Sequence, residues 1–127
     1  MNNILVIEDE KFLANAYRLK LVSEGFTVQI ASDGNEAMQK LNSFIPDLII
    51  LDLIMPAKDG FAVLADIKAD LRFKHIPVLI ASNLSQQEDI DKAMQLGASG
   101  FIVKSEMSLE NVVTKIRSLL SPVSSPT

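Results

Sequence analysis

The chain has 127 residues, and 12 Lys and Arg against 16 Asp and Glu give it a net charge of −4. With 48% hydrophobic and 22% charged residues, it has the composition of one globular domain rather than of a disordered segment. The acidic excess argues against direct nucleic acid binding, and the absence of cysteine excludes disulfides and thiolate metal sites. No apolar run reaches the roughly 18 residues that cross a membrane. We expect a small, acidic, cytoplasmic domain.

Short apolar runs along the chain predict five strands. The runs at 3–8, 47–53, 76–82 and 100–104 lack polar alternation, which indicates strands that are covered on both faces. The segment 27–31 alternates apolar and polar residues, which favours an edge strand. Four buried strands and one edge strand are typical of a parallel sheet between two helix layers.

Apolar residues at helical spacing predict five helices between and after these strands. The expected buried stripes are Phe12, Leu13, Ala16 and Leu19; Ala37, Leu41, Phe44 and Ile45; Leu64, Ile67 and Leu71; Ile90, Ala93 and Met94; and Leu109, Val112, Val113, Ile116 and Leu120. Capping boxes are predicted at 33–36 and 85–88, Ser108 is expected to start the last helix, and Gly25 and Gly97 are expected to end the first and fourth.

This alternation of strand and helix predicts an α/β three-layer sandwich with a five-stranded parallel sheet and right-handed crossovers. One domain is expected over 1–120, followed by a Ser- and Pro-rich tail or linker stub at 121–127. Whether the chain is a stand-alone protein or a piece of a longer one stays open. In such sheets ligands bind beyond the carboxyl ends of the strands, where the strand order reverses. Functional residues are therefore expected directly after the strands.

The predicted strand ends collect carboxylates, one hydroxyl and one ammonium group. Glu8 and Asp9 follow the first strand, Asp52 ends the third, Ser82 the fourth and Lys104 the fifth. Clustered carboxylates repel one another unless a cation joins them, and oxygen ligands without His or Cys suit Mg²⁺. A carboxylate beside Mg²⁺ and a lysine is suited to receive a phosphoryl group as a nucleophile. The pattern thus favours phosphoryl chemistry at this edge of the sheet.

Each of these residues also has a plainer interpretation. Glu8 or Asp9 could cap the first helix, and Lys104 alone could be an ordinary surface lysine. Asp52 differs, because it interrupts an apolar run, where a buried charge needs a partner. The presence of all of them at one sheet end favours the functional interpretation.

Four segments make residues 2–120 similar to the receiver domain of bacterial two-component response regulators. They are Val6-Ile7-Glu8-Asp9; Asp52-Leu-Ile-Met-Pro56 with Asp59-Gly60; Pro77-Val-Leu-Ile-Ala-Ser82; and Gly97-Ala-Ser-Gly-Phe-Ile-Val-Lys104. The resemblance implies a flavodoxin-like fold with strand order 2-1-3-4-5. It further implies a domain that catalyses its own phosphorylation and dephosphorylation and turns over no separate substrate.

The resemblance also implies a role for each site residue. Asp52 would accept a phosphoryl group from a sensor histidine kinase or histidine phosphotransfer protein, with Lys104 binding the phosphoryl group. The metal ligands would be Glu8, Asp9, Asp52 and the backbone carbonyl of Ile54, with Glu8 acting directly or through a water. Ser82 would be the switch hydroxyl and Phe101 the switch aromatic residue. A downstream protein would bind the face made by the fourth helix, fifth strand and fifth helix.

Three residues depart from the usual receiver pattern. Asn83 follows the switch hydroxyl where a small residue is common, Ser105 follows Lys104 where proline is common, and Phe101 lacks a hydroxyl. A cis peptide bond costs about 3 kcal/mol when the residue after it is not proline. Since Ser105 lacks the tertiary amide by which proline lowers that cost, we predict a trans Lys104–Ser105 peptide. These departures affect the conformational switch more than the chemistry.

Two other functions are open to a chain of this kind. One is a degenerate receiver that binds proteins without phosphorylation, against which the complete set of site residues argues. The other is a Mg²⁺-dependent aspartyl phosphatase, which would carry a general acid where this chain has Ile54. Ile54 and Leu84 are instead expected to flank the path of a hydrolytic water and to exclude it, which predicts a long-lived phosphorylated form.

Overall fold

The computed structural model describes residues 2–55, 59–84 and 86–120. Five parallel strands form one sheet in the order β2-β1-β3-β4-β5, as predicted. The strands are β1 (Asn3–Ile7), β2 (Thr27–Ala31), β3 (Leu48–Leu51), β4 (Val78–Ser82) and β5 (Gly100–Val103). Except for β2, they are shorter than the predicted runs by one to three residues. Strands β1, β3 and β5 end before the polar residues Glu8, Asp52 and Lys104, whereas β4 begins only after Pro77, which has no N–H to donate to a neighbouring strand.

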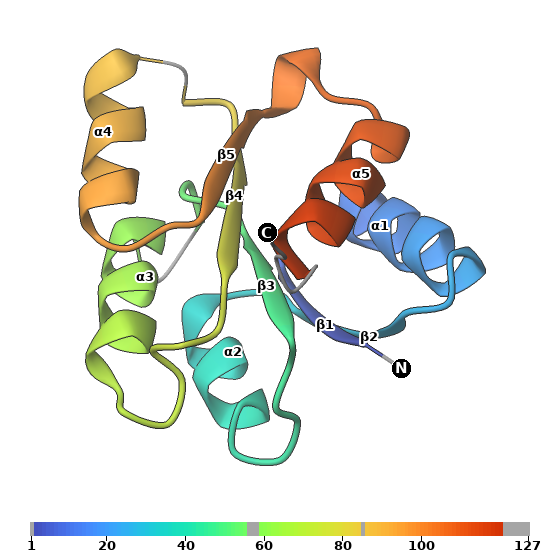
Figure 1. The fold of residues 1–127 in the computed structure, drawn as a ribbon, viewed down its shortest axis with the longest axis horizontal. Helices are drawn as coiled ribbons and strands as arrows, with labels where there is room; N and C mark the ends of the chain where they lie inside the picture. Colours follow the sequence, from blue (N-terminus) through green and yellow to red (C-terminus); the bar gives the residue numbers. More distant parts are fainter. Residues whose placement is uncertain (1, 56–58, 85, 121–127) are drawn as a thin grey trace, which may run out of the picture.

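Five helices cover the two faces of this sheet. They are α1 (Lys11–Ser23), α2 (Gly34–Lys40), α3 (Gly60–Ala69), α4 (Gln87–Gln95) and α5 (Leu109–Leu120), with a 3₁₀ turn, η1 (Lys104–Glu106), before α5. Helices α1 and α5 lie on one face, and α2, α3 and α4 lie on the other (Figure 1). The three-layer α/β sandwich is therefore confirmed. No helix among the described residues has the length and apolarity that a membrane crossing requires.

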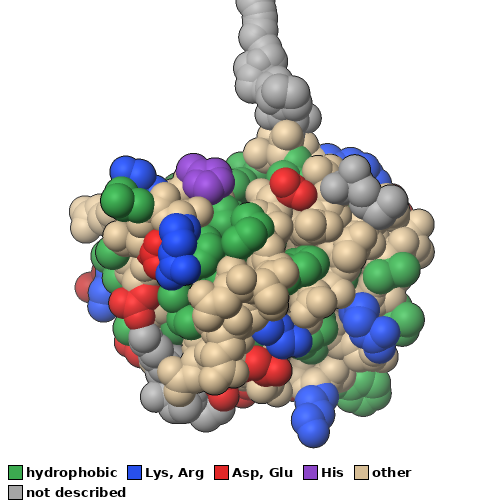
Figure 2. All heavy atoms as spheres, turned by 90° about the horizontal axis from the view of Figure 1, so that it is seen from below, with side chains coloured by type: hydrophobic (Ala, Val, Ile, Leu, Met, Phe, Trp, Pro, Cys, Tyr) green, Lys and Arg blue, Asp and Glu red, His purple; other side chains and the backbone are tan. Residues whose placement is uncertain are grey.

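The core is divided by the sheet into two apolar clusters. Alternate residues of the central strands point to opposite sides, so that Ile4 and Val6 pack with α1 and α5, whereas Leu5 and Ile7 pack with α2, α3 and α4. Every residue of β3 and β4 is buried, in agreement with the prediction from their continuous apolar runs. The same prediction for 100–104 is wrong, because β5 lies at the edge of the sheet and is mostly half-buried. Seen from below, Lys, Arg, Asp and Glu side chains are dispersed among apolar ones over the surface (Figure 2).

The stripe predicted for the first helix is wrong in part, since Leu13 packs half-buried against the core as predicted. Phe12 is 87% exposed and Leu19 is 60% exposed, whereas Ala14, Tyr17 and Leu21 face the core. Apolar residues occur on all sides of this helix, so that two different stripes fit the helical period. The sequence alone does not determine which of the two stripes is buried. Tyr17 is the largest buried residue of the helix. Because tyrosine carries a polar hydroxyl, a search for purely apolar residues at helical spacing does not include it.

Two other predicted stripes run past the ends of their helices. Leu71 is 79% exposed because α3 ends at Ala69, and Ile45 is 52% exposed because α2 ends at Lys40. Met94, in α4, is also exposed. The stripe of α5 is confirmed: three of its residues are buried and the outer two are half-buried.

Side chains cap several helices as the sequence indicates. Asp33 Oδ1 accepts a hydrogen bond from Glu36 N at 2.8 Å, and Ser108 Oγ accepts one from Asn111 N at 3.1 Å. The second predicted capping box begins at Ser85, which lies outside the described residues, as does the predicted tail 121–127.

The glycines predicted to end α1 and α4 have the expected conformation. Gly25 has φ 96° and Gly97 has φ 108°, values that glycine adopts without steric cost. The cap at the start of α1 is neither Glu8 nor Asp9. Glu10 accepts a hydrogen bond from Leu13 N at 3.2 Å, which leaves the two preceding carboxylates available for the site.

Candidate functional site

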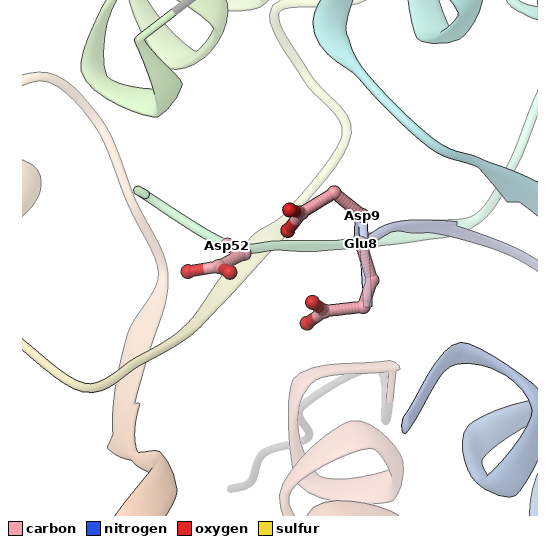
Figure 3. Close-up of side chains that lie close together, drawn as sticks. All are labelled: Glu8, Asp9 and Asp52. Atoms are coloured by element: carbon pink, nitrogen blue, oxygen red, sulfur yellow. The ribbon is translucent and has the colours of Figure 1, made fainter. Parts of the chain in front are cut away.

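Three carboxylates meet at the carboxyl ends of β1 and β3 (Figure 3). Glu8 and Asp9 directly follow β1, and Asp52 directly follows the neighbouring strand β3. One oxygen of each carboxylate lies within 4.8 Å of the others. Glu8 and Asp52 are buried, while Asp9 is exposed. The structure thus brings together the three acidic residues that the sequence predicts as metal ligands.

Lys104 pairs with two of these carboxylates. Its ammonium Nζ lies 2.7 Å from Glu8 Oε1 and 2.9 Å from Asp52 Oδ2. Burial raises the pKa of Glu8, and hydrogen bonds from Lys104 and from the backbone of Glu10 offset only part of that rise. Burial alone would lower the pKa of Lys104, but the two ion pairs outweigh it and raise that pKa. Lys104 is therefore a charged group held directly against Asp52.

Backbone N–H groups donate hydrogen bonds to the second oxygen of each buried carboxylate, the one that does not pair with Lys104. Glu10 N donates to Glu8 Oε2 at 3.1 Å, and Ile54 N donates to Asp52 Oδ1 at 3.1 Å. The backbone of Asp52 is itself anchored, because Asp52 N donates to Ile7 O at 3.1 Å. Both carboxylates are consequently oriented by the chain before any cation or ligand binds.

Gly60 supports the backbone that carries Asp52. Gly60 N donates to Leu53 O at 3.0 Å, and its α-carbon packs directly on this segment. A Cβ at position 60 would lie 2.5 Å from Asp52 O and 2.8 Å from Leu53 C, which is too close for any side chain. Asp59-Gly60 belongs to one of the four segments that carry the resemblance to receiver domains, and the structure supplies the steric reason for the glycine.

The carboxylates open into a pocket of about 440 Å³. It is lined by Glu8, Asp9, Glu10, Leu13, Asp52, Ile54, Asn83, Lys104 and Ser105. Asn83 and Ile54 are exposed, and Ile54 has 55% of its surface accessible. Leu84, in contrast, packs against the apolar cluster on the α2–α4 side. The buried carboxylates are therefore reachable from solvent through this opening.

The remaining predicted site residues lie on β4 and β5. Ser82 is completely buried at the end of β4, and its Oγ accepts a hydrogen bond from Leu84 N at 3.3 Å. Phe101 is half-buried and packs against the same apolar cluster as Leu84. The described residues contain no cis peptide bond, which confirms the predicted trans Lys104–Ser105 peptide.

The donor set of this cluster fits Mg²⁺. All three side chains offer carboxylate oxygens, the ligand type that hard divalent cations prefer, and one of them remains exposed for entry. Two buried carboxylates balanced by a single ammonium leave a net negative charge that a divalent cation would offset.

Residues 4–117 match the family model described as "Response regulator receiver domain". The chain belongs to the response regulator receiver domain family. The receiver domain is 33% identical over 120 residues to the DNA-binding dual master transcriptional regulator RpaA of Synechocystis sp.. That match covers 94% of this chain and 49% of RpaA, so the chain spans about half the length of this relative.

Solved structures agree with this assignment. The Mn²⁺-bound form of response regulator Rcp1 is 32% identical, with a TM-score of 0.84 and complete coverage of both chains. The phosphorylated cyanobacterial phytochrome response regulator RcpA is 34% identical, with a TM-score of 0.84 and 99% coverage of both chains. Each of these two response regulators of known structure thus matches at least 99% of this chain.

The sequence places Glu10 beside Glu8 and Asp9 but predicts no role for it, and it predicts none for Tyr17. Glu10 caps α1 and lines the pocket, and Tyr17 lies in the core beneath the carboxylates, whose charges act on it. Glu10 stands two residues before the first residue of the predicted stripe, where the sequence indicates the start of a helix. Tyr17 carries no comparable signal, because it lies outside the apolar stripe predicted for this helix.

Proposed function

We propose that the receiver domain accepts a phosphoryl group on Asp52 from the phosphohistidine of a histidine kinase or a phosphotransfer protein. The pairing of buried Asp52 with Lys104, beside the acidic cluster, carries this proposal. An oxygen of Asp52 attacks phosphorus, the donor's P–N bond breaks, and its electron pair leaves with the imidazole. The product is an acyl phosphate on Asp52, and no separate substrate is turned over.

Glu8, Asp9, Asp52 and the backbone carbonyl of Ile54 would hold Mg²⁺, with Glu8 acting directly or through a water. Bound there, the cation would neutralise charge on the phosphoryl oxygens. The Mn²⁺-bound form of Rcp1 supports a divalent cation in this family. Lys104, already 2.9 Å from Asp52, would transfer its hydrogen bonds to the incoming phosphoryl group.

Ser82 and Phe101 would carry the signal away from the site. The Ser82 hydroxyl is buried at the end of β4, next to β5, where it would donate to the phosphoryl group. Phe101 is the β5 residue that would change position. A downstream protein would then bind the face made by α4, β5 and α5, where a groove of about 430 Å³ lies along β5 and α5.

The wider setting belongs to the same proposal. The net charge of −4 disfavours nucleic acid as a direct partner of this domain, and RpaA shows by its name that relatives carry DNA binding in longer chains. We assign residues 1–120 to the receiver domain and 121–127 to a tail or linker stub, and place the protein in the cytoplasm.

Intact-mass spectrometry tests the proposed function. With acetyl phosphate and Mg²⁺, the receiver domain should gain the mass of one phosphoryl group, and Asp52→Asn should gain none. Asp9→Asn, which keeps the acceptor, should still be labelled, but slowly. A parent protein that stays unlabelled, or an Asp52→Asn variant labelled like the parent, would overturn the assignment.

Asp9→Asn should weaken Mg²⁺ binding by roughly tenfold or more, because it replaces an anionic ligand by a neutral amide. Isothermal titration calorimetry with MgCl₂ measures the effect. Glu10→Gln is the matched control: its side chain lines the same pocket but caps α1, a role that the Gln oxygen can keep. Equal affinities of Asp9→Asn and the parent would place the cation elsewhere.

The phosphorylated form should be long-lived, because Ile54 borders the pocket with an apolar side chain that cannot orient a hydrolytic water. Ile54→Asn should speed phosphate loss about tenfold, equivalent to about 1.4 kcal/mol of barrier. Release of ³²P from the labelled proteins gives the rates, with Ile54→Leu as the apolar control. Because Leu84 is half-buried against the core and does not line the pocket, Leu84→Glu should be measured separately. Equal decay of Ile54→Asn and the parent would refute water exclusion.

A further inference from the structure

Lys104 is the first residue of the 3₁₀ turn η1, and the sequence of that turn does little to fix its backbone. Lys104, Ser105 and Glu106 follow one another through trans peptides, and none of them restricts φ as a proline would. The turn nevertheless holds the Lys104 ammonium within hydrogen-bond distance of two carboxylates. Because its own residues leave the turn free to move, contacts between the turn and the rest of the domain decide how well the ammonium is positioned.

Met107, at the end of the turn, is held at two points. Its backbone N donates to Lys104 O at 3.3 Å, which closes the turn. Its sulfur Sδ accepts a hydrogen bond from the Tyr17 hydroxyl, with 3.6 Å between the two atoms. The side chain of Met107 is half-buried and packs against the apolar cluster on the α1 and α5 side. Met107 thus ties the turn to the core of the domain.

Tyr17 is well suited to anchor this contact. It projects from α1, is 1% exposed and belongs to the apolar cluster shared by β1, β3 and α5. Burial, together with the charges of Glu8 and Asp52, raises its pKa, so that the hydroxyl remains a proton donor. A rigid aromatic ring in a packed core presents that hydroxyl at a fixed position.

We propose that Tyr17 is a positioning residue for phosphoryl transfer: its hydroxyl, acting through Met107, fixes the turn that presents Lys104 to Asp52. The inference rests on the proposed function, since it assigns to Tyr17 a part in the use of that site. Tyr17 is not a catalytic residue, because its hydroxyl acts on Met107 and not on the reacting atoms.

Tyr17→Phe removes the hydroxyl and keeps the ring, so it tests the contact with little change in packing. At saturating Mg²⁺, the rate of phosphorylation by acetyl phosphate should fall about three- to tenfold, the effect of one lost hydrogen bond. The Mg²⁺ concentration for half-maximal rate should stay within about twofold, since a positioning effect on Lys104 does not remove a metal ligand. A general loss of structure would change both quantities.

Three variants distinguish the proposed path from a local packing effect. Met107→Leu should slow phosphorylation like Tyr17→Phe, and the double variant should be no slower than either single one. In a Lys104→Ala background, Tyr17→Phe should have no further effect. Ser23→Ala, which removes an exposed hydroxyl bonded only within α1, should match the parent. Additive effects, or slowing by Tyr17→Phe without Lys104, would overturn the inference.

A second readout needs no phosphoryl donor. Tyr17 is the only tyrosine and the chain has no tryptophan, so the emission of tyrosine reports on this residue alone. Lys104→Ala should change that emission, whereas Lys40→Met should not. If the parent is never phosphorylated but the emission responds, the proposed function fails and the coupling stands. A different outcome is that the parent protein is phosphorylated while Lys104→Ala leaves the emission unchanged and Tyr17→Phe leaves the phosphorylation rate unchanged. In that case the role of Tyr17 is refuted and the proposed function stands.

Discussion

Gly60→Ala should destabilise the receiver domain by about 3 kcal/mol and slow phosphorylation of Asp52 at least tenfold. The new Cβ would lie 2.5 Å from Asp52 O and 2.8 Å from Leu53 C, and both are backbone atoms that cannot rotate away. Either the start of α3 or the segment after β3 must shift. A shift of the latter displaces the nucleophile from Lys104, so the variant should lose both stability and activity.

Urea unfolding and phosphorylation kinetics measure the two effects. Gly25→Ala is the matched control, because its Cβ would meet no atom within 4 Å and the residue lies at the far end of α1. Its positive φ should cost about 1 kcal/mol and leave the phosphorylation rate unchanged. A Gly60→Ala variant as stable and as active as the parent would contradict the close packing at the acceptor.

Lys104→Met should have opposite effects on metal binding and on phosphorylation. The ammonium lies 2.7 Å from Glu8 and 2.9 Å from Asp52, and its removal leaves two buried carboxylates without their cation. Without metal, the free energy of unfolding should fall by about 3 kcal/mol. Mg²⁺ should bind roughly tenfold more tightly, because it no longer competes with the ammonium. Phosphorylation should nevertheless slow by about 10²-fold, since the phosphoryl oxygens lose a charged donor.

Calorimetric Mg²⁺ titration, thermal unfolding with and without Mg²⁺, and single-turnover labelling test this combination. Lys40→Met serves as the control, because Lys40 pairs with Glu36 at 3.9 Å on the surface, where an ion pair contributes little. Weaker Mg²⁺ binding by Lys104→Met would show that Lys104 supports the metal site instead of competing with it.

The fold was predictable because its three central strands, β1, β3 and β4, are buried on both faces. Continuous apolar runs such as those of β3 and β4 have few alternative structures, and they located the sheet correctly. The phase of α1 was not predictable, because apolar residues surround that helix and only the neighbouring elements decide which stripe is covered. The exposure of Leu71 and Ile45 follows from early helix ends, which the apolar spacing does not reveal.

The sequence predicts which residues form the site, but it does not predict the contacts between them. Strand ends in a parallel sheet converge, so Glu8, Asp9, Asp52 and Lys104 were expected at one edge. That Lys104 bridges Glu8 and Asp52 depends on side-chain conformations that a sequence does not encode locally. The contact between Tyr17 and Met107 joins positions 90 residues apart, and no spacing rule predicts it.

Chemical mapping of the phosphorylated residue tests the central claim most directly. Borohydride reduces an acyl phosphate to the corresponding alcohol, so reduction of the labelled receiver domain followed by proteolysis and mass spectrometry identifies the acceptor. We expect homoserine at position 52 and unmodified carboxylates at Glu8 and Asp9, which lie close enough to be the alternative acceptors. Homoserine at position 9, the glutamate-derived alcohol at position 8, or an unmodified Asp52 in labelled protein would contradict the account.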